Sequence, residues 1–236
     1  MKSIKSALKS NALIRRIYHR LNAGRDYTSL WLKNIWSRIS WRLNKPGLPE
    51  SDGVYVHLGC GEINHPKMIN IDLRPERHIH YLHGVEDLPM FKDNTVDLIY
   101  ISHCLEHVSH LRLYEVLNEW NRVLKPNGIL RISVPNFETI LEIYKDSNYD
   151  LDEILQPMLG GQDYKYNFHY SAFDSKYLTK ILEQSGFGSV KPWNKGDDDF
   201  TNFDDWSNRG IMFKDKEYKI SLNIQGVKRS EQSEQL

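Results

Sequence analysis

The segment from Ser102 to His110 gathers the side chains of this chain that are best suited to proton transfer or metal binding. It reads Ser-His-Cys-Leu-Glu-His-Val-Ser-His. On a helix, residues three and four positions apart share one face. Four polar residues have this spacing: His103, Glu106, His107 and His110. Imidazoles beside a carboxylate can act as a general base or hold a divalent metal. The ordinary alternative is a solvated helix surface.

The position of this segment favours a site over a solvated surface. It follows Val96–Ile101, an apolar run that we expect to be a buried strand. In an open parallel sheet, ligands lie outside the carboxyl ends of the strands. His-x-x-Glu-His also matches the inverted zinc-protease motif, but that interpretation needs a distant glutamate ligand and does not explain the glycine turn upstream.

A glycine turn between two predicted strands is the second chemical feature. Val54–Leu58 is rich in β-branched and aromatic residues and ends at Gly59, and Met68–Ile71 ends at Asp72. Gly59 and Gly61 permit positive φ and remove side chains that would keep a ligand from the backbone amides. A carboxylate at the tip of the second strand can accept both hydroxyls of a ribose. Gly-x-Gly alone is a weak signal, because an ordinary turn has the same composition.

Later segments strengthen this interpretation. Leu-Pro at 88–89, an Asp-Asn turn at 93–94, a Val-Asp-Leu-Ile strand, and a helix ending in Arg-Val-Leu-Lys-Pro-x-Gly before a strand at 129–134 follow in order. This ordered set resembles the class I S-adenosylmethionine-dependent methyltransferases over roughly residues 54–228. The resemblance implies a Rossmann-like α/β fold with a seven-stranded sheet, mostly parallel with an antiparallel hairpin at its edge.

The first crossover of this sheet is predicted to be short. Only nine residues, Gly59–Lys67, join the first two strands, so the usual helix after the glycine turn should be missing or one turn long. A similarly short Gly-Cys-Gly loop ending in Asn-x-Asp resembles a bacterial branch linked to surface polysaccharide biosynthesis of the O-antigen type. Near the C-terminus, we expect a helix over Ser175–Ser185 and two antiparallel strands, Ser189–Trp193 and Tyr218–Val227. The aspartate-rich stretch Asp197–Asp205 is expected to be a surface loop over the acceptor site.

The resemblance also implies that the chain binds S-adenosylmethionine. Two positions depart from the superfamily pattern. His57 stands where many relatives carry an acid near the cofactor's amino group, and Gly84 stands where an acid often meets the adenine. The Val85 amide and Glu86 are the expected substitutes. The candidate cofactor-binding residues are His57, Gly59, Cys60, Gly61, Asp72, Leu73, Val85, Glu86 and Ser102.

The histidine segment resembles methyltransferases that carry Glu-x-x-Glu-His, in which this motif and a later histidine hold a divalent metal for a hydroxyl acceptor. Here His103 replaces the first glutamate, while Glu106 and His107 match. The later histidine is expected to be His169, in the polar aromatic loop 160–170, whose composition suits gripping a sugar. The candidate metal ligands are therefore His103, Glu106, His107 and His169. The candidate catalytic residues are His103, His107 and His169; without a metal, His107 or His169 would be the general base.

Composition divides the chain into parts of opposite charge. The net charge is zero, but residues 1–46 hold eleven Lys or Arg and one acid, which leaves 20 basic and 30 acidic groups in the remainder. Pro and Gly in Lys45–Pro49 indicate a linker. We therefore expect a basic amphipathic helical arm at 1–46, a methyltransferase domain at 47–229 and a disordered tail at 230–236.

The arm contains two apolar repeats at helical spacing. These are Leu13, Ile14, Ile17, Tyr18 and Leu21, and then Leu32, Ile35, Trp36, Ile39 and Leu43. It lacks the apolar run of a signal peptide or membrane span. Its basic charge and tryptophans suit an anionic membrane surface, and a lid over the cofactor is an equal alternative. Nucleic acid is a weaker candidate, because the acidic remainder would repel phosphates. The oligomeric state is left open.

The function expected from these features is methyl transfer from S-adenosylmethionine to an oxygen, most simply a sugar hydroxyl of a bacterial surface glycan. The alternative is a non-catalytic methyltransferase-like binding module in a membrane glycan-assembly complex. A cofactor-binding measurement separates the two. The two cysteines suit a reducing cytosol, so we expect a cytoplasmic protein, attached peripherally to the inner face of the membrane if the arm binds lipid.

Overall fold

The computed structural model describes residues 27–202 and 204–230, with the side chains of 27–34 omitted. The first predicted arm helix and nearly all of the predicted tail lie outside these ranges. The chain forms two compact units, one containing residues up to Lys45 with Pro75–Arg77, and one containing Pro46–Arg74 with the residues from His78 onward. Each unit is described below by itself.

The first unit contains α3 (Tyr27–Leu43), which confirms the second predicted arm helix. The helix carries basic residues and no acidic residue. It ends just before the Lys45–Pro46–Gly47 stretch, where proline cannot continue a helix. No helix in the described part of the chain combines the length and hydropathy that a membrane crossing requires.

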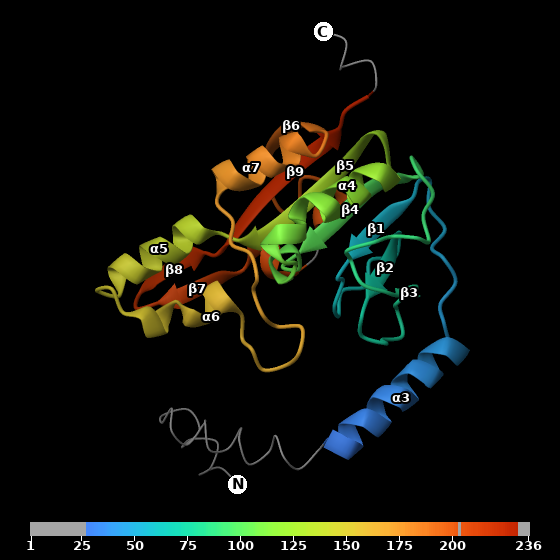
Figure 1. Cartoon of the computed structure of the whole chain (residues 1–236), viewed down its shortest axis with the longest axis horizontal. Helices are drawn as coiled ribbons and strands as arrows, with labels where there is room; N and C mark the ends of the chain where they lie inside the picture. The colour runs from blue at the N-terminus through green and yellow to red at the C-terminus, as the bar shows by residue number, and fades with distance from the viewer. Residues whose placement is uncertain (1–26, 203, 231–236) are drawn as a thin grey trace. The chain divides into compact units, whose positions relative to one another are not determined.

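The second unit is built on a seven-stranded sheet with the order β3-β2-β1-β4-β5-β9-β6 (Figure 1). The strands are β1 (Tyr55–Leu58), β2 (Met68–Asp72), β3 (Tyr81–Leu82), β4 (Val96–Ser102), β5 (Leu124–Pro135), β6 (Phe187–Pro192) and β9 (Ser221–Lys228). β1 to β5 are mutually parallel, and β9 runs antiparallel to both β5 and β6. The predicted fold is confirmed. The order reverses at β1 and β4, which creates a crevice beyond their carboxyl ends.

Helices α4 (Leu113–Val123) and α7 (Ser175–Gln184) cover one face of this sheet. Each is amphipathic, because its apolar residues recur at three- and four-residue spacing. Trp120 of α4 and Leu178, Ile181 and Leu182 of α7 are buried in the main core with Ile99 and Ile101 of β4. The helix predicted over Ser175–Ser185 is therefore confirmed.

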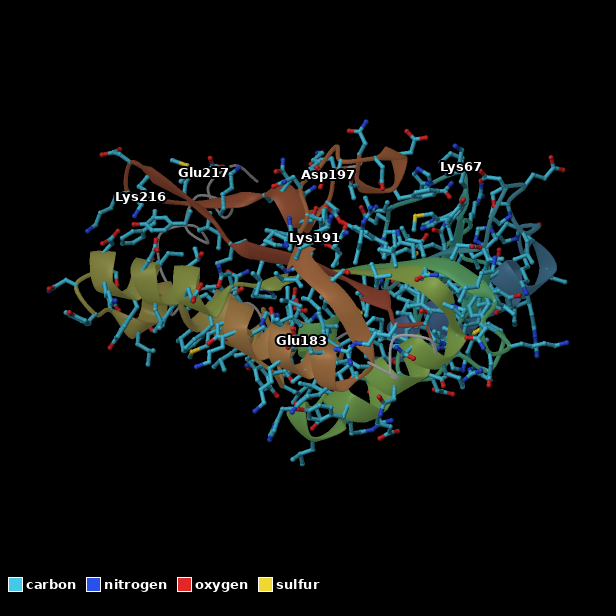
Figure 2. The ribbon with its side chains drawn as sticks, turned by 90° about the horizontal axis from the view of Figure 1, so that it is seen from above. Lys67, Glu183, Lys191, Asp197, Lys216 and Glu217 are labelled. Atoms are coloured by element: carbon cyan, nitrogen blue, oxygen red, sulfur yellow. The ribbon has the colours of Figure 1, made fainter. Side chains whose placement is uncertain are left out.

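The chain has no α-helix between β1 and β4, a stretch that the structure describes throughout. The sheet face opposite α4 and α7, called the helix-free face below, therefore lacks the usual crossover helix there. The short first crossover is confirmed. The segment 193–209, which contains η4 (Asp199–Thr201) and η5 (Trp206–Asn208), covers this face instead. Trp193 packs with Met68, Leu98 and Tyr100 in a separate apolar cluster. Figure 2 shows Asp197 of this segment on one side of the sheet and Glu183 of α7 on the other.

Two polar contacts fix this covering segment to the sheet. The Arg131 guanidinium of β5 donates to both carboxylate oxygens of Asp198, with Nη1–Oδ1 at 2.7 Å. The Tyr100 hydroxyl of β4 donates to Asp205 Oδ2 at 2.6 Å. The aspartates predicted to lie over the acceptor site therefore serve as anchors on the helix-free face.

A small second sheet is inserted between β6 and β9. It pairs β7 (Gly210–Phe213) with β8 (Lys216–Lys219), and it packs on α5 (Phe137–Asp146) through a cluster of Ile140, Ile143, Ile154, Tyr218 and Ile220. Figure 2 shows Lys216 and Glu217 at this end of the molecule. The strand predicted over Tyr218–Val227 is wrong at its start, because Tyr218 belongs to β8 and the sheet edge begins at Ser221. The short elements η3 (Leu151–Glu153) and α6 (Leu155–Leu159) follow α5.

Candidate functional site

The glycine turn after β1 has the geometry that only glycine adopts without strain. Gly59 and Gly61 have φ of 61° and 58°. The amides of Gly59 and Cys60 donate to the Ile71 carbonyl of β2 at 2.8 and 3.3 Å. A Cβ placed on Gly59 would lie 2.5 Å from Cys104 Sγ. The turn is thus folded tightly between β2 and the segment after β4.

Asp72, at the end of β2, holds this turn. Its Oδ2 accepts from the Gly61 amide at 2.9 Å, and its Oδ1 accepts from the Arg74 amide at 2.8 Å and from Arg74 Nε at 3.3 Å. Each carboxylate oxygen can accept more than one hydrogen bond. The carboxylate therefore retains capacity for ribose hydroxyls, as the sequence predicts.

A cavity of about 500 Å³ lies at the carboxyl ends of β1, β2 and β4. One wall comes from the glycine turn and the segments after β2 and β3, and the other from residues 103–108 and 164–170. Seven of the predicted site residues line it: Gly59, Asp72, Leu73, Val85, Glu86, His103 and His107. The donor-binding and acceptor-binding features predicted from the sequence therefore share one cavity.

Four predicted cofactor residues do not line the cavity wall. His57 is 2% exposed and packs edge-to-face on Tyr100, with ring centroids 5.1 Å apart, because strand alternation turns it toward the helix-free face. Burial lowers the pKa of His57 to about 4. Cys60 is buried, Ser102 is half-buried at the end of β4, and Gly61 acts through its amide on Asp72. His57 and Ser102 therefore do not line this cavity, and their contact with the cofactor stays a prediction.

Other cavity residues were missed. Arg74 lies two residues after Asp72 and reaches back to it, a local signal that could have been used. Cys104 lines the cavity through its contact with Gly59, which arises only from long-range packing. Burial raises the pKa of the Cys104 thiol far above its usual range, so this side chain is a neutral thiol. Gly84 also lines the cavity, and a Cβ there would meet no atom within 4 Å.

The helix predicted over residues 103–110 is wrong. His103 has a φ of 48°, and two short 3₁₀ turns follow, η1 (Leu105–His107) and η2 (His110–Arg112). Val108 between them is extended, with φ −83° and ψ 138°. As a result, His110 is exposed and lies outside the cavity wall.

Long-range hydrogen bonds explain this local structure. The Glu106 carbonyl accepts from the amides of Tyr170 and Ser171 at 2.8 and 3.1 Å, and the Val108 carbonyl accepts from Ser171 Oγ at 2.7 Å. A continuous helix would occupy these carbonyls with its own amides. The His169 amide donates to the Leu159 carbonyl at 3.1 Å. The loop after α6 is thereby fixed against η1.

This docking brings together Glu106, His107 and His169, whose candidate ligand atoms all lie within 4.8 Å of one another. The His107 ring is oriented by the Phe168 carbonyl, 2.9 Å from Nδ1. Because a carbonyl only accepts, Nδ1 carries the proton, and Nε2 has the lone pair in the neutral ring. His107 is therefore preset as a base or as a metal ligand.

His103 is held differently from the other three residues. Its Nδ1 lies 3.4 Å from Glu106 Oε1, and its Nε2 lies 2.7 Å from Ser221 Oγ. The Ser221 hydroxyl donates its only proton to the Trp206 carbonyl at 2.7 Å, so His103 Nε2 donates to Ser221. The predicted four-residue ligand set is thus reduced to three, and His103 links the site to β9.

Glu106 is a carboxylate buried among imidazoles. It is 1% exposed, and neither of its oxygens accepts a hydrogen bond from any described residue. Burial by itself would raise its pKa, but His103, with His107 and His169, lowers the pKa below its ordinary value. Burial lowers the pKa of His169, which lies 4.0 Å from Glu106 Oε1. A buried carboxylate requires a positive partner, which a metal or a protonated imidazole supplies.

Aromatic side chains form the outer part of the acceptor wall. Tyr164, Tyr166 and Tyr170 line the cavity and are exposed, as predicted for the loop 160–170. Lys165 Nζ lies 5.0 Å from the Tyr166 ring centroid. Exposed phenol rings beside a cavity can stack on the face of a ring-shaped ligand.

Comparison with known proteins agrees with this arrangement. Residues 63–132 match the family model of a methyltransferase domain. The matched residues and the curated relatives support an S-adenosylmethionine-dependent methyltransferase. The residues present fit that cofactor, since the glycine turn and the Asp72 carboxylate both line the cavity.

Curated relatives of the methyltransferase domain include the ubiquinone/menaquinone biosynthesis C-methyltransferase UbiE of Vibrio parahaemolyticus. It is 26% identical over 152 residues, which make up 58% of this chain and 57% of the relative. The demethylmenaquinone methyltransferase of Staphylococcus haemolyticus is 29% identical over 135 residues, or 52% of this chain and 55% of the relative. The chain thus spans about half the length of the curated relatives that it matches.

Solved structures similar to the methyltransferase domain include an S-adenosylmethionine-dependent methyltransferase from Thermotoga maritima. Its TM-score is 0.48 at 17% identity, and the match covers 91% of this chain and 99% of that chain. The 1,6-didemethyltoxoflavin-N1-methyltransferase of Burkholderia thailandensis, with S-adenosylhomocysteine bound, has a TM-score of 0.48 at 14% identity and covers 93% and 88%.

Proposed function

We propose that the protein transfers the methyl group of S-adenosylmethionine to a sugar hydroxyl of a bacterial surface glycan. The observation that carries this proposal is His107, a cavity residue whose Nδ1 is bonded to the Phe168 carbonyl. Its neutral ring can accept a proton at Nε2, in the same cavity as the glycine turn and the tyrosines. O-methylation requires a donor site and a base, and the tyrosine wall adds a surface on which a ring-shaped acceptor can stack.

The bound cofactor supplies an already activated methyl group, so the chain contributes proximity and proton transfer. His107 Nε2 takes the proton of the acceptor hydroxyl as the oxygen–carbon bond forms and the sulfur–carbon bond breaks. Glu106, close to His107, is a carboxylate that would stabilise the imidazolium. Its burial strengthens this electrostatic effect.

The proposal of a sugar acceptor rests on the loop 160–170 and on the first crossover. Tyr164, Tyr166 and Tyr170 offer ring faces with hydroxyl tips, a combination suited to a molecule with apolar faces and polar edges. The short Gly-Cys-Gly loop ending in Asn-x-Asp resembles the branch of the superfamily linked to surface polysaccharides. Both features support a glycan acceptor.

Labelled methyl donor incubated with a panel of glycans tests the proposal. We expect transfer to at least one glycan, and a loss of about 10²- to 10⁴-fold in the rate for His107→Gln, the range for a general base. His110→Gln is the matched control, because His110 is exposed outside the cavity. Binding of S-adenosylhomocysteine should be unchanged in both variants. Binding without transfer to any glycan would overturn the sugar assignment, and absence of binding would overturn the donor assignment.

A second candidate acceptor is suggested by the curated relatives, whose names describe a C-methyltransferase of quinone biosynthesis and a demethylmenaquinone methyltransferase. The tyrosine wall can stack on a planar aromatic ring as well as on a sugar. The acceptor panel should therefore include demethylmenaquinone. Transfer to this quinone and to no glycan would replace the sugar proposal by carbon methylation.

A divalent metal is an alternative means of acceptor activation. Glu106, His107 and His169 offer three ligand atoms, and the Glu106 oxygens have no hydrogen bond from the described residues. The Phe168 carbonyl orients His107 as an outer-shell partner orients a metal-binding imidazole. A metal there would lower the pKa of a coordinated hydroxyl, and the donor set suits zinc, manganese, iron or nickel better than magnesium.

Elemental analysis and chelation decide between the base and the metal. If a metal acts, purified protein should contain about one transition metal per chain, and a chelator should abolish transfer while added metal restores it. Full activity in chelator-treated protein without metal would exclude this alternative and leave His107 as the base.

A further inference from the structure

The last turns of α3 expose large apolar side chains on one face. Trp36, Ile39 and Leu43 are 68%, 45% and 80% exposed. They lie three and four residues apart, so they share a face of the helix. Exposed apolar residues gathered in this way mark a surface that binds another partner.

The charged residues of the same helix have a single sign. Arg38 and Arg42 are exposed, and α3 contains no acidic residue. Lys45 follows the helix, with Nζ 5.9 Å from the Trp41 ring centroid. By contrast, the sequence after residue 46 contains 30 acidic and 20 basic groups. The partner of α3 must accept both apolar and basic side chains.

We propose that α3 docks on an anionic lipid bilayer and lies in the plane of its interface. Trp36, Ile39 and Leu43 would enter the boundary between headgroups and acyl chains, with Arg38 and Arg42 at the phosphates. Tryptophan favours this boundary because its ring has an apolar body and a polar N–H. A lipid bilayer also suits this face of α3 because a fluid surface can accept the side chains without a matching shape. The negative charge of the sequence after residue 46 disfavours attachment through that part of the chain.

Co-sedimentation of the full-length protein with vesicles tests this inference. We expect binding to vesicles of phosphatidylcholine with 30% phosphatidylglycerol, weakening as salt rises, and no binding to phosphatidylcholine alone. Replacing Trp36 and Leu43 together by serine should weaken binding at least tenfold. So should the charge reversals Arg38→Glu and Arg42→Glu together.

A matched control distinguishes binding through α3 from a general effect of the protein's net charge. Lys176→Glu with Lys191→Glu makes the same change of charge on exposed residues of α7 and β6, and should alter binding less than twofold. Equal losses in the two charge-reversal pairs, or no binding by the wild type, would overturn the proposal. A dimer seen by light scattering and lost only in the α3 variants, without vesicle binding, would assign the face to a second copy instead.

This inference is independent of the chemistry proposed for the cavity. S-adenosylhomocysteine affinity, measured by calorimetry, should be the same in the α3 variants and the wild type. Failure of vesicle binding would leave the proposed function untouched, and failure of methyl transfer would leave the membrane proposal untouched.

Discussion

One carboxylate serves two purposes at the donor end of the cavity. Asp72 accepts the Gly61 amide and the Arg74 amide, and thereby holds the glycine turn in place. It also lines the cavity, where ribose hydroxyls are expected to donate to it. Any change at Asp72 will therefore affect both the shape of the turn and the binding of the cofactor.

We predict that Asp72→Asn weakens S-adenosylhomocysteine binding by about 1.5–3 kcal/mol, the range for hydrogen bonds to a charged group. This corresponds to roughly a 10- to 150-fold rise in Kd. Isothermal titration calorimetry measures it, and Glu142→Gln, an exposed carboxylate on α5, is the control. Unchanged affinity in Asp72→Asn would show that the ribose binds elsewhere.

His57 gives the protein a specific sensitivity to acid. Its pKa is lowered to about 4 in the folded state by burial, against 6.5 ordinarily, so between these values the unfolded chain binds one more proton. The free energy of unfolding should fall by about 3 kcal/mol as the pH is lowered through this window. Urea unfolding at pH 7 and pH 4 measures this loss. His57→Gln should lack this part of it, and an equal loss in the variant would refute the assignment to His57.

At the residue scale, the sequence predicts the positions of residues that lie in one turn or at one strand end. Gly59, Gly61 and Asp72 lie within one turn and one strand end, so their places in the fold could be predicted from sequence, and their contacts with the cofactor stay a prediction. The side chain of His57 could not be placed in this way, because its position in a superfamily pattern does not say which sheet face it joins. Strand alternation sends it away from the cavity.

At the scale of elements, the segment after β4 shows the limit of periodicity. Its polar residues have helical spacing, yet Glu106 and Val108 give their carbonyls to Tyr170 and Ser171. These partners lie some sixty residues later, and no local pattern reveals them. The prediction that His169 joins Glu106 and His107 was nevertheless correct, because it used a resemblance between proteins rather than local spacing.

Two cavity glycines should differ in their tolerance of substitution by alanine. Gly59→Ala would bring a Cβ within 2.5 Å of Cys104 Sγ at a positive φ, so we expect a loss of stability of about 1–3 kcal/mol and weaker cofactor binding. Gly84→Ala, where no atom lies within 4 Å, should be stable and is the control. Thermal unfolding and calorimetry measure both. Equal effects at the two positions would contradict the tight contact with Cys104.

At the scale of the whole molecule, the chain separates into two units of opposite charge. The seven-stranded sheet and its antiparallel edge could be expected from the resemblance to the methyltransferase superfamily, whereas the strand order is known only from the structure. The small sheet of β7 and β8 could not be predicted, since its strands are only four residues each and share a core with α5 and Ile154.

A fragment of residues 46–230 should fold and bind S-adenosylhomocysteine with the affinity of the full chain. The main core and both walls of the cavity belong to the second unit, and the fragment also retains Pro75–Arg77, which belong to the first unit and do not line the cavity. Calorimetry of fragment and full-length protein measures this. A fragment that folds but binds at least tenfold more weakly would show that the arm completes the cofactor site, as a lid does.

The covering of the helix-free face by residues 193–209 sets the order in which the molecule can be completed during synthesis. Met68, Leu98 and Tyr100 emerge from the ribosome long before Trp193, their partner. Until then, one side of β1, β2 and β4 faces water, and a partly made chain exposes a sheet surface prone to aggregation. We therefore expect a chain that stops at Pro192 to be insoluble or bound to chaperones when expressed, as fractionation of cell lysates would show. The C-terminal fifth of the chain is thus needed to cover the face of β1, β2 and β4 and to prevent its aggregation.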